Sequence, residues 1–485
     1  MLSIDQCDTC DTPFLYQQVV DSIIENIDTG ALRPGDRLPS LRRMSQAAGV
    51  SIPTVRQAYI ELEKQRRVES RPQSGFYVRS SRANRLVRKT ETSAADPVEL
   101  SCRSLMKRIY DGINDPDLVP LGIANPTMAK PAANSLHRAM KRVIARASER
   151  CIGYSPTLGE PALRRQIAFH YLDTTGVTVD PEHIAITNGG QEALLLALSA
   201  VASHGDVIAV ETPTYHGLLE LIDSLGMLAI EVETCPEEGI TITELERTLK
   251  THPVKACMLS TTLGNPLGVT MPDVDRQRLV DLLAEHDVVL IEDDVYGDLR
   301  FDGRRPMPAQ FLDSGAQVIT CGSFSKTAAP GYRIGWLVSR HYSERIEHLK
   351  RAFSCTSGLL QQLTLAEFMA TGDYARYLKT LRTALKYNAE RMTGLVAEYF
   401  PRETRVSKPA GGSVLWLELP GRVDAERLFD EAIEAGISIT PGHIFSPCAR
   451  YTNFIRLSYG HPWGERTEGA IRWLGERVVG LSDKP

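Results

Sequence analysis

The sequence predicts an α/β protein with a mostly parallel central sheet, preceded by a small helical module of different charge. Five short apolar runs, from "HIAIT" to "QVITC", alternate with amphipathic stretches between residues 183 and 321, the pattern of parallel strands covered by helices. Residues 31–90 contain 14 Lys and Arg against 4 Asp and Glu, whereas the whole chain has 55 and 60. The 485 residues therefore divide into a basic first part and an acidic remainder, and they are too many for one ordinary domain.

The first part begins with a helix-turn-helix pattern. Residues 14–27 place apolar side chains at helical spacing, and "TGALRPGDRLPS" then interrupts the helix with Gly and Pro. Ser40 can cap a second helix, "LRRMSQAA", which we expect to stop at Gly49. Ser51 can cap a third helix, "IPTVRQAYIELEKQR". Two short helices around a Gly-containing turn, followed by the strand candidates "RVESRP" and "FYVRS", indicate a helix-turn-helix with a strand pair.

The third helix has an inner and an outer face. Val55, Ala58, Tyr59 and Leu62 recur at spacings of three and four, so we expect them to face the core of the module. The N-terminal residues of a recognition helix reach base edges in the major groove of DNA, and nearby arginines contact phosphates. The residues that we expect to contact DNA are Arg42, Arg43, Ser51, Thr54, Arg56, Gln57 and Arg71. The alternative is a basic face that only meets solvent.

Residues 12–79 resemble the winged helix-turn-helix of GntR-type bacterial regulators, through the segment "GALRPGDRLPSLRRMSQAAGVSIPTVRQAYIELEKQRRVESRPQSGFYV". The resemblance implies double-stranded operator DNA as a partner, contacted by Arg42 and by the residues that open the recognition helix. Members of this family often have Arg after the Val-Ser pair, whereas this chain has Ile52, so we expect different bases to be read. Residues 80–116 lose periodicity and are expected to form a partly flexible linker, with some helix near "SLMKRIYDGI".

In the second part, residues 117–481, polar groups follow the predicted strands. "NGGQEALL" follows "HIAIT", "LGNPLG" follows "KACMLSTT", "EDDVYGD" follows "DVVLI" and "GSFSK" follows "QVITC". Ligands of parallel sheets gather beyond the carboxyl ends of the strands. Each motif alone has an ordinary explanation as a turn or a helix start, but the motifs in this order predict one binding site.

Pyridoxal 5'-phosphate (PLP) would use all of these groups. Its aldehyde needs a lysine for a Schiff base, which assigns Lys326. Its pyridine nitrogen needs a carboxylate, which assigns Asp293, and its phenolic oxygen needs hydrogen-bond donors. Its phosphate needs an arginine, hydroxyls and helix-start amides, and its ring needs an aromatic side chain to stack on. The predicted cofactor-binding residues are Gly190, Gln191, Tyr215, Asn265, Asp293, Tyr296, Ser323, Ser325, Lys326 and Arg333.

Residues from about 118 to 481 are similar to fold-type I aminotransferases, in which a smaller C-terminal α+β subdomain accompanies the PLP-binding sheet. The matching motifs include "YSPTLGEPALRRQIA", "ETPTY", "GSFSKTAAPGYRIGW" and "FIRLSY". The resemblance implies that Lys326 is the Schiff-base lysine and that Arg456 pairs with the α-carboxylate of a ligand. It also implies that Tyr154 reaches the cofactor phosphate across a dimer interface. A structural ion pair is the alternative role for Arg456.

Taken together, the two parts are similar to the MocR subfamily of bacterial transcription regulators. This resemblance implies a head-to-tail homodimer that binds DNA and senses PLP or an amino-acid-type effector. Two other functions stay open. A working aminotransferase tethered by its DNA module would turn over an amino donor and a 2-oxo acid. A binding protein that holds PLP only as a structural plug would keep its ligand response when Lys326 is replaced.

Other classes of protein are not favoured by the sequence. Cys7 and Cys10 form one CxxC without a second pair, so we expect no metal site. The nine scattered cysteines fit a reducing cytoplasm. The acidic N-terminus lacks the basic and apolar regions of a signal peptide, and the longest apolar stretch, "ALLLALSAVA", is about half of the ~20 residues that span a membrane. We therefore expect a cytoplasmic protein.

Overall fold

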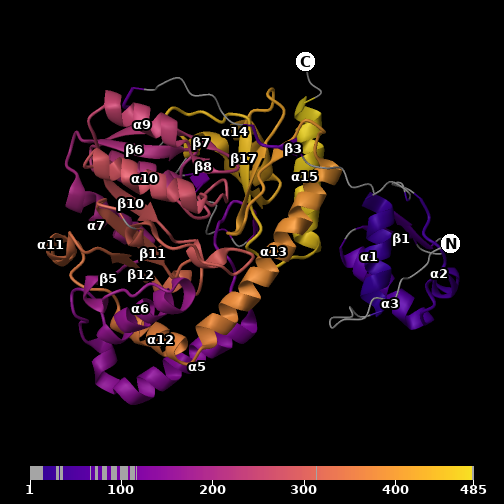
Figure 1. Ribbon diagram of the computed structural model, residues 1–485, viewed down its shortest axis with the longest axis horizontal. Helices are drawn as coiled ribbons and strands as arrows, with labels where there is room; N and C mark the ends of the chain where they lie inside the picture. The colour runs from indigo at the N-terminus through magenta and orange to yellow at the C-terminus, as the bar shows by residue number, and fades with distance from the viewer. Residues whose placement is uncertain are drawn as a thin grey trace. The chain divides into compact units, whose positions relative to one another are not determined.

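The computed structural model describes residues 15–28, 32, 36–65, 67–71, 75–78, 85–88, 96–98, 108–109, 115, 117–312 and 314–482. The chain divides into two compact units, Met1–Ala83 and Asn84–Pro485 (Figure 1). Each unit has a hydrophobic core of its own. No helix within the described ranges is long and apolar enough to cross a membrane.

The described residues of the N-terminal unit form three helices and a strand pair. Its elements are α1 (Leu15–Asp28), α2 (Leu41–Ala48), α3 (Ile52–Lys64), β1 (Val68–Arg71) and β2 (Gly75–Val78). The two strands pair antiparallel, with Val68 opposite Val78. The predicted inner face of α3 is confirmed, because all four of its expected core residues are buried. Tyr59 ties this helix to its surroundings, since its hydroxyl donates to the Pro39 carbonyl at 2.8 Å and its ring lies 5.1 Å from that of Phe76.

The ends of α2 and α3 are set by the capping residues that the sequence predicts. The Ser40 hydroxyl accepts a hydrogen bond from the Arg43 amide at 3.4 Å, and the Ser51 hydroxyl accepts one from the Thr54 amide at 3.3 Å. Each bond satisfies an amide that the helix itself leaves without an acceptor. Gly49 ends α2 in the left-handed conformation, with φ of +67°.

The larger unit is built on a mixed sheet of eight strands, in the order β5-β12-β11-β10-β9-β6-β7-β8. Strands β11, β10, β9, β6 and β7 are parallel, whereas β12 runs antiparallel to β5 and β11, and β8 antiparallel to β7. The five predicted strands are all present. The bounds are β5 (Ile184–Thr187), β6 (Val207–Thr212), β7 (Leu228–Cys235), β8 (Gly239–Ile240), β9 (Val254–Leu259), β10 (Val289–Asp293), β11 (Val318–Ser323) and β12 (Gly335–Val338).

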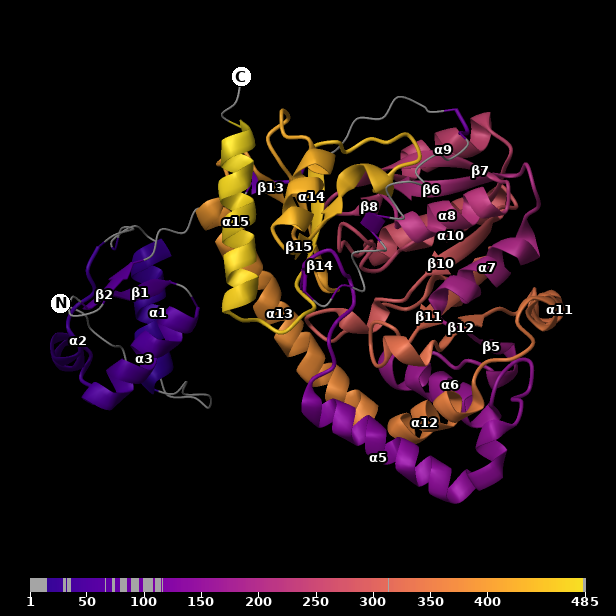
Figure 2. The ribbon, with the colours of Figure 1, turned by 180° about the vertical axis from the view of Figure 1, so that it is seen from behind.

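Helices cover both faces of this sheet (Figures 1 and 2). Side chains of a strand alternate between faces, so Ile208 and Val210 pack with α7 (Gly190–Val201), α8 (His216–Ser224) and α11 (Ser343–Phe353). Val207 and Ala209 pack with α9 (Ile242–Thr251) and α10 (Asp273–Glu285) on the other side. Burial on both faces explains why these strands are continuous apolar runs in the sequence.

A second sheet forms the C-terminal subdomain, in the order β16-β17-β14-β13-β3. Its strands are β3 (Arg85–Leu86), β13 (Arg405–Val406), β14 (Val414–Glu418), β16 (Thr440–Pro441) and β17 (Phe454–Ser458). A short parallel pair joins β4 (Val119–Pro120) to β15 (Ile437–Ser438). The helices α13 (Asp373–Tyr399) and α15 (Glu465–Ser482) lie side by side in both views (Figures 1 and 2). Further α-helices with described bounds are α5 (Lys130–Ala147), α6 (Pro161–Thr175), α12 (Leu359–Ala370) and α14 (Ala425–Glu434).

The described residues of the expected linker are attached to the larger unit. Residues 85 and 86 form β3, which pairs in parallel with β13. The Arg88 guanidinium pairs with Glu418 at the end of β14, and Val98 forms a bridge with Ala229 of β7. Arg108 pairs with Glu426 of α14 at 3.4 Å. This segment of low periodicity therefore adds a strand to the second sheet, because a partner from elsewhere in the fold supplies its hydrogen bonds.

Candidate functional site

The predicted polar groups follow strand ends at one edge of the large sheet. Asn188 and Gly189 follow β5, Asp293 ends β10, and Lys326 follows β11. The carboxyl ends of parallel strands share one edge, and β10 and β11 are parallel neighbours there, with Asp293 opposite Cys321. The sheet therefore gathers motifs that are far apart in the sequence.

Lys326 lies in the turn between β11 and β12. Its Nζ donates a hydrogen bond to the Asn125 side-chain oxygen and lies 5.8 Å from the centre of the Tyr296 ring. Burial and, after it, the positive charge of Arg456 lower the pKa of Lys326 to about 8, while Asp293 acts in the opposite direction. A depressed lysine pKa makes the neutral, nucleophilic amine available close to neutral pH.

Asp293 carries a buried carboxyl group, and its charge and that of Lys326 influence each other's pKa. Burial raises the pKa of Asp293 to about 6, while the Val295 amide, which donates to its Oδ1 at 3.3 Å, and the charge of Lys326 oppose that rise. The pKa values of Asp293 and Lys326 are therefore shifted towards each other, from both sides of neutrality. Titratable groups with perturbed pKa values in one concave region are typical of functional sites.

Tyr215 and His216 lie beside these charges at the start of α8. Their rings are 4.7 Å apart, and the charges of Asp293 and Arg456 both influence the pKa of Tyr215, which burial raises to about 12. A Cβ added to Gly217 would lie 2.5 Å from the Tyr215 ring, so this glycine leaves room for the ring. Burial lowers the pKa of His216 to about 3, which keeps the imidazole neutral.

Arg333 lies beside the backbone amides at the start of α7. Gly189 has φ of +85°, and a Cβ added there would clash with the Arg333 guanidinium. The guanidinium donates to the Asn188 carbonyl at 3.2 Å. Gly190 is the first residue of α7 and lies close to the Ser323 side chain. The Ser323 hydroxyl donates a hydrogen bond to the Ser325 hydroxyl at 3.0 Å. Helix-start amides, hydroxyls and an arginine together are a donor set for a phosphate group.

Gln191 helps to hold this region together. Its side-chain amide donates to the Gly217 carbonyl at 2.8 Å, which links the start of α7 to the start of α8. Because this hydrogen bond engages the Gln191 side-chain amide, Gln191 contributes to the site through its position at the start of α7.

Arg456 projects from β17 and is buried. Its guanidinium donates to the Gly122 carbonyl at 2.6 Å, to the Thr440 hydroxyl at 3.1 Å and to the Asn265 side-chain oxygen at 3.2 Å. These three acceptors are uncharged oxygens that orient the guanidinium. The Phe445 ring lies 5.2 Å from it. The bond to Asn265 leaves the Asn265 NH2 group to donate elsewhere, as the predicted contact to a phenolic oxygen requires.

The other predicted residues lie as follows. Tyr154 is 87% exposed and makes no described contact with the residues around Lys326. In the N-terminal unit Arg42, Arg43 and Arg56 are exposed, as is Gln57. The hydroxyls of Ser51 and Thr54 bond to each other at 2.8 Å as part of the helix cap. The side chain of Arg71 lies outside the described residues, as do Cys7 and Cys10.

The residues around Lys326 fit PLP. The chemistry of the donor set matches each polar part of the cofactor, and the turn at Gly189 would be filled by any Cβ. Among the described residues, the buried Tyr296 hydroxyl has no well-aligned hydrogen-bond partner, although the Ser413 side chain interacts with it. Buried hydroxyls ordinarily have a partner, so this group is available to donate to a bound molecule.

Sequence reasoning missed Asn125, His216 and Thr440. Asn125 comes from the segment before α5 and reaches Lys326 only through the tertiary fold. His216 follows the predicted Tyr215 directly, and this position next to a motif residue was the only signal for it. Thr440 lies on an edge strand of two residues, which no local pattern indicates.

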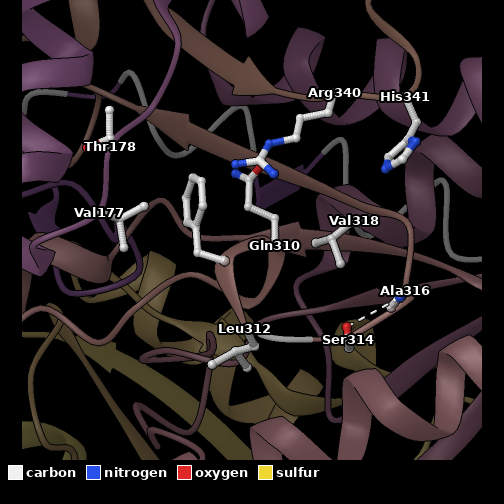
Figure 3. Close-up of a pocket in the computed structure, with 10 residues that line it drawn as sticks. Val177, Thr178, Gln310, Leu312, Ser314, Ala316, Val318, Arg340 and His341 are labelled. Carbon is white, nitrogen blue, oxygen red and sulfur yellow. Dashed lines mark hydrogen bonds between the residues drawn. The ribbon is translucent and has the colours of Figure 1, made fainter.

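A separate pocket lies at the opposite edge of the large sheet, by the start of β11 and the end of β12 (Figure 3). Its volume is about 450 Å³, and Gln310, Arg340 and His341 are among the residues that line it. None of the predicted site residues lines this pocket. The chemistry described above therefore belongs to the edge with Lys326.

Comparisons with known proteins agree with both parts of the chain. The family model for aminotransferase class I and II matches residues 116–471, and that for bacterial regulatory proteins of the gntR family matches residues 15–78. The HTH-type transcriptional regulator YjiR of Escherichia coli is 35% identical over 96% of this chain and 98% of that protein. The 2-aminoadipate transaminase of Thermus thermophilus is 30% identical over 71% of this chain and 85% of its own length.

A solved structure extends the agreement to the fold of the larger unit. The α-aminoadipate aminotransferase LysN from Thermus thermophilus, complexed with N-(5'-phosphopyridoxyl)-L-leucine, has a TM-score of 0.71 and 28% identity. The match covers 79% of this chain and 96% of that one. The aminotransferase class and these neighbours indicate PLP as the cofactor.

Proposed function

Because this chain belongs to the aminotransferase class I and II family and joins that domain to a GntR-family DNA-binding module, we propose that its cofactor site controls its binding to DNA. The chain is a GntR-type transcription regulator with an aminotransferase-like domain, the arrangement of the MocR subfamily. The observation that carries the proposal is the position of Arg456, which belongs both to the site around Lys326 and to the sheet that holds the interdomain segment.

Each part of the site has a role towards the cofactor. PLP, when bound, supplies an aldehyde that condenses with amines and a ring that withdraws electrons. Lys326 would provide the amine, since its pKa of about 8 leaves a share of neutral Nζ near neutral pH. Asp293, with a pKa of about 6, would be ionised there and would hold a proton on the pyridine nitrogen. The start of α7, with Ser323 and Arg333, would bind the phosphate.

The effector that fits this site carries one amine and one carboxylate. Its amine would replace the Nζ of Lys326, and Arg456 would bind its carboxylate through two parallel hydrogen bonds. The cations that influence Lys326 are Arg456 and Arg333. Arg333 lies at the phosphate end, so Arg456 is the cation of this pair that would meet the effector carboxylate. The sequence motifs supply no clear second arginine for a side-chain carboxylate, which favours an amino acid without an acidic side chain.

The second sheet offers a route from this site to the DNA module. Arg456 of β17 lies opposite Trp416 of β14, and β14 is linked through β13 to β3 in the interdomain segment. The Arg405 guanidinium donates to the Leu86 carbonyl at 3.2 Å, which fastens β3 further. A shift of this sheet on effector binding would move the attachment of the segment that follows the DNA module. The ligand must bind two arrangements with different affinity for this to change DNA binding.

We further propose that two chains form a head-to-tail homodimer. Ile152 is 89% exposed and its neighbour Tyr154 is 87% exposed, and large apolar side chains exposed together mark interaction surfaces. A partner chain that covers them would bring Tyr154 close to the phosphate site of the other protomer. Paired DNA modules would bind two half-sites with a gain in affinity that needs no new contact.

A working aminotransferase is the second candidate, since the transaminase of Thermus thermophilus is 30% identical to this chain. It predicts turnover of an amino donor and a 2-oxo acid at ordinary enzyme rates, roughly 1–10³ s⁻¹. The regulator predicts slower or no turnover and a change in DNA binding with PLP.

Lys326→Ala separates these functions. We expect the variant to bind DNA but to lose any response to PLP together with an amino acid. A variant that keeps the full ligand response would show that PLP is only a structural plug. Fast turnover by the wild type, without any effect of PLP on DNA affinity, would favour the enzyme.

A further inference from the structure

The first turn of α3 exposes an apolar side chain at the helix end that is expected to meet DNA. Ile52 is the first residue of α3, and 42% of its surface is exposed. Pro53, which follows it, is exposed as well. Neither residue belongs to the hydrophobic core of the N-terminal unit, whose α3 members begin at Val55. The two side chains therefore form an apolar tip with no described packing role in their own unit.

The polar groups around this tip are occupied or positively charged. The hydroxyls of Ser51 and Thr54 bond to each other at 2.8 Å, and the Ser51 hydroxyl also accepts the Thr54 amide, so the cap uses both groups. Arg56, one turn later, is exposed and forms no ion pair within the described residues. The first turns of α2 and α3 contain no acidic residue. The positive charge of Arg56 near the start of α3 thus favours phosphate groups, whereas the side chains of Ile52 and Pro53 offer only hydrocarbon.

We propose that Ile52 reads the 5-methyl group of a thymine in the major groove. Thymine is the one base that presents a methyl group there, and apolar side chains recognise it by direct contact. The contact would remove the exposed hydrocarbon of Ile52 from water together with that methyl group. A donor such as Arg56 or Gln57 could read a neighbouring base at the same time. This inference rests on the DNA-binding role of the module.

Replacing thymine by uracil tests the contact, because the two bases differ in the major groove by the methyl group alone. The probe is the DNA upstream of the chain's own gene, trimmed to the protected segment, with one thymine at a time replaced by deoxyuridine. At the contacted position we expect the wild type to bind about fourfold more weakly, the equivalent of ~0.8 kcal/mol for one buried methyl-sized group. Ile52→Ser should bind both probes equally, and Ile52→Val should keep the difference.

Leu15→Ser is the matched control. Leu15 is a 58% exposed apolar residue on α1 of the same unit, and its loss should leave the thymine preference unchanged. Circular dichroism should show the same folded content for all three variants, since each changes an exposed side chain. The proposal is wrong if no single uracil substitution weakens the wild type, or if the penalty persists in Ile52→Ser. Absence of any sequence-specific binding by the wild type would instead contradict the regulator function itself.

Discussion

Arg88 and Glu418 form an ion pair between the interdomain segment and the sheet that carries Arg456. The Arg88 Nε donates to a Glu418 oxygen at 2.8 Å, and the Arg88 amide donates to the other oxygen at 3.2 Å. The Glu418 side chain is 4% exposed, whereas that of Arg88 is 68% exposed. The buried Glu418 carboxylate thus accepts one side-chain and one backbone hydrogen bond from the interdomain segment. These bonds fix the path of the segment at Arg88.

This ion pair predicts a variant that separates ligand binding from its effect. In Arg88→Gln we expect PLP affinity and PLP-free DNA affinity to stay within about twofold of wild type, since neither site is touched. The change in DNA affinity caused by PLP should shrink markedly. Glu418 is buried but keeps Arg405 at 3.7 Å as a second cation, so the loss of stability should be moderate, about 1–3 kcal/mol. DNA titrations with and without PLP measure the effect.

Arg142→Gln is the control for that experiment. Arg142 is 44% exposed and pairs with Glu367 of α12 at 2.8 Å, so it is a comparable ion pair away from the second sheet. It should keep the full response to PLP. An unchanged response in Arg88→Gln would show that the signal does not pass through β3.

The lowered pKa of Lys326 predicts the pH dependence of PLP uptake. Only the neutral amine attacks an aldehyde, so the rate of uptake should rise with pH and level off above about 8. Beyond the effect of burial, Arg456 lowers this pKa and Asp293 raises it. Arg456→Gln should therefore move the midpoint to higher pH, and Asp293→Asn to lower pH. Stopped-flow absorbance of bound PLP follows the reaction, and equal midpoints in all three proteins would contradict the electrostatic account.

The turn at Gly189 predicts a loss of phosphate binding on a minimal substitution. Gly189→Ala adds a Cβ that would clash with the Arg333 guanidinium, so the arginine must move away. We expect PLP affinity to fall at least tenfold, about 1.4 kcal/mol. Gly176→Ala controls for backbone strain, because Gly176 also has positive φ, +75°, but no atom lies within 4 Å of its added Cβ. That variant should lose stability without a change in PLP affinity.

A buried network behind the site predicts how stability depends on pH. Asp298 accepts hydrogen bonds from Arg305 at 2.6 Å and from His170 at 2.9 Å. Burial alone would raise the pKa of Asp298, but the charges of Arg305 and His170 outweigh it and hold this pKa well below its usual range. Asp298→Asn removes one of the two carboxylates that pair with the buried Arg305, the other being Asp294, which should cost about 3 kcal/mol in the free energy of unfolding at pH 7.

The sign of the pH effect follows from the direction of that shift. The contribution of Asp298 is fully present above the unfolded pKa near 4 and falls as pH drops towards the lower folded value. The gap between wild type and Asp298→Asn should therefore narrow between about pH 5 and pH 3, as measured by urea unfolding. A gap that widens on acidification would contradict the assignment of the depressed pKa to Asp298.

Local patterns predicted the parts of the fold that depend on neighbours in sequence. Ser40 and Ser51 cap helices because the helix start needs an acceptor three residues earlier, and the parallel strands are apolar because both faces are covered. Asn125 and β3 could not be found in this way. Asn125 meets Lys326 across 201 positions, and β3 is two exposed residues that pair only because β13 offers an edge.

The DNA contacts and the roles of Tyr154 and Arg456 stay predictions of the sequence. The arginines predicted to contact DNA on α2 and α3 are exposed, and exposure alone does not test that role. Arg456 was assigned from resemblance, and its uncharged acceptors are a property that only the tertiary structure provides.

The central claim is that the cofactor site and the DNA module are coupled, and the affinity for upstream DNA with and without PLP, at one fixed salt concentration, tests it most directly. We expect PLP to change the dissociation constant for DNA, and saturating DNA to change that for PLP by the same factor, because coupling between two sites is reciprocal. Equal DNA affinity in both conditions, with PLP bound, would contradict the claim.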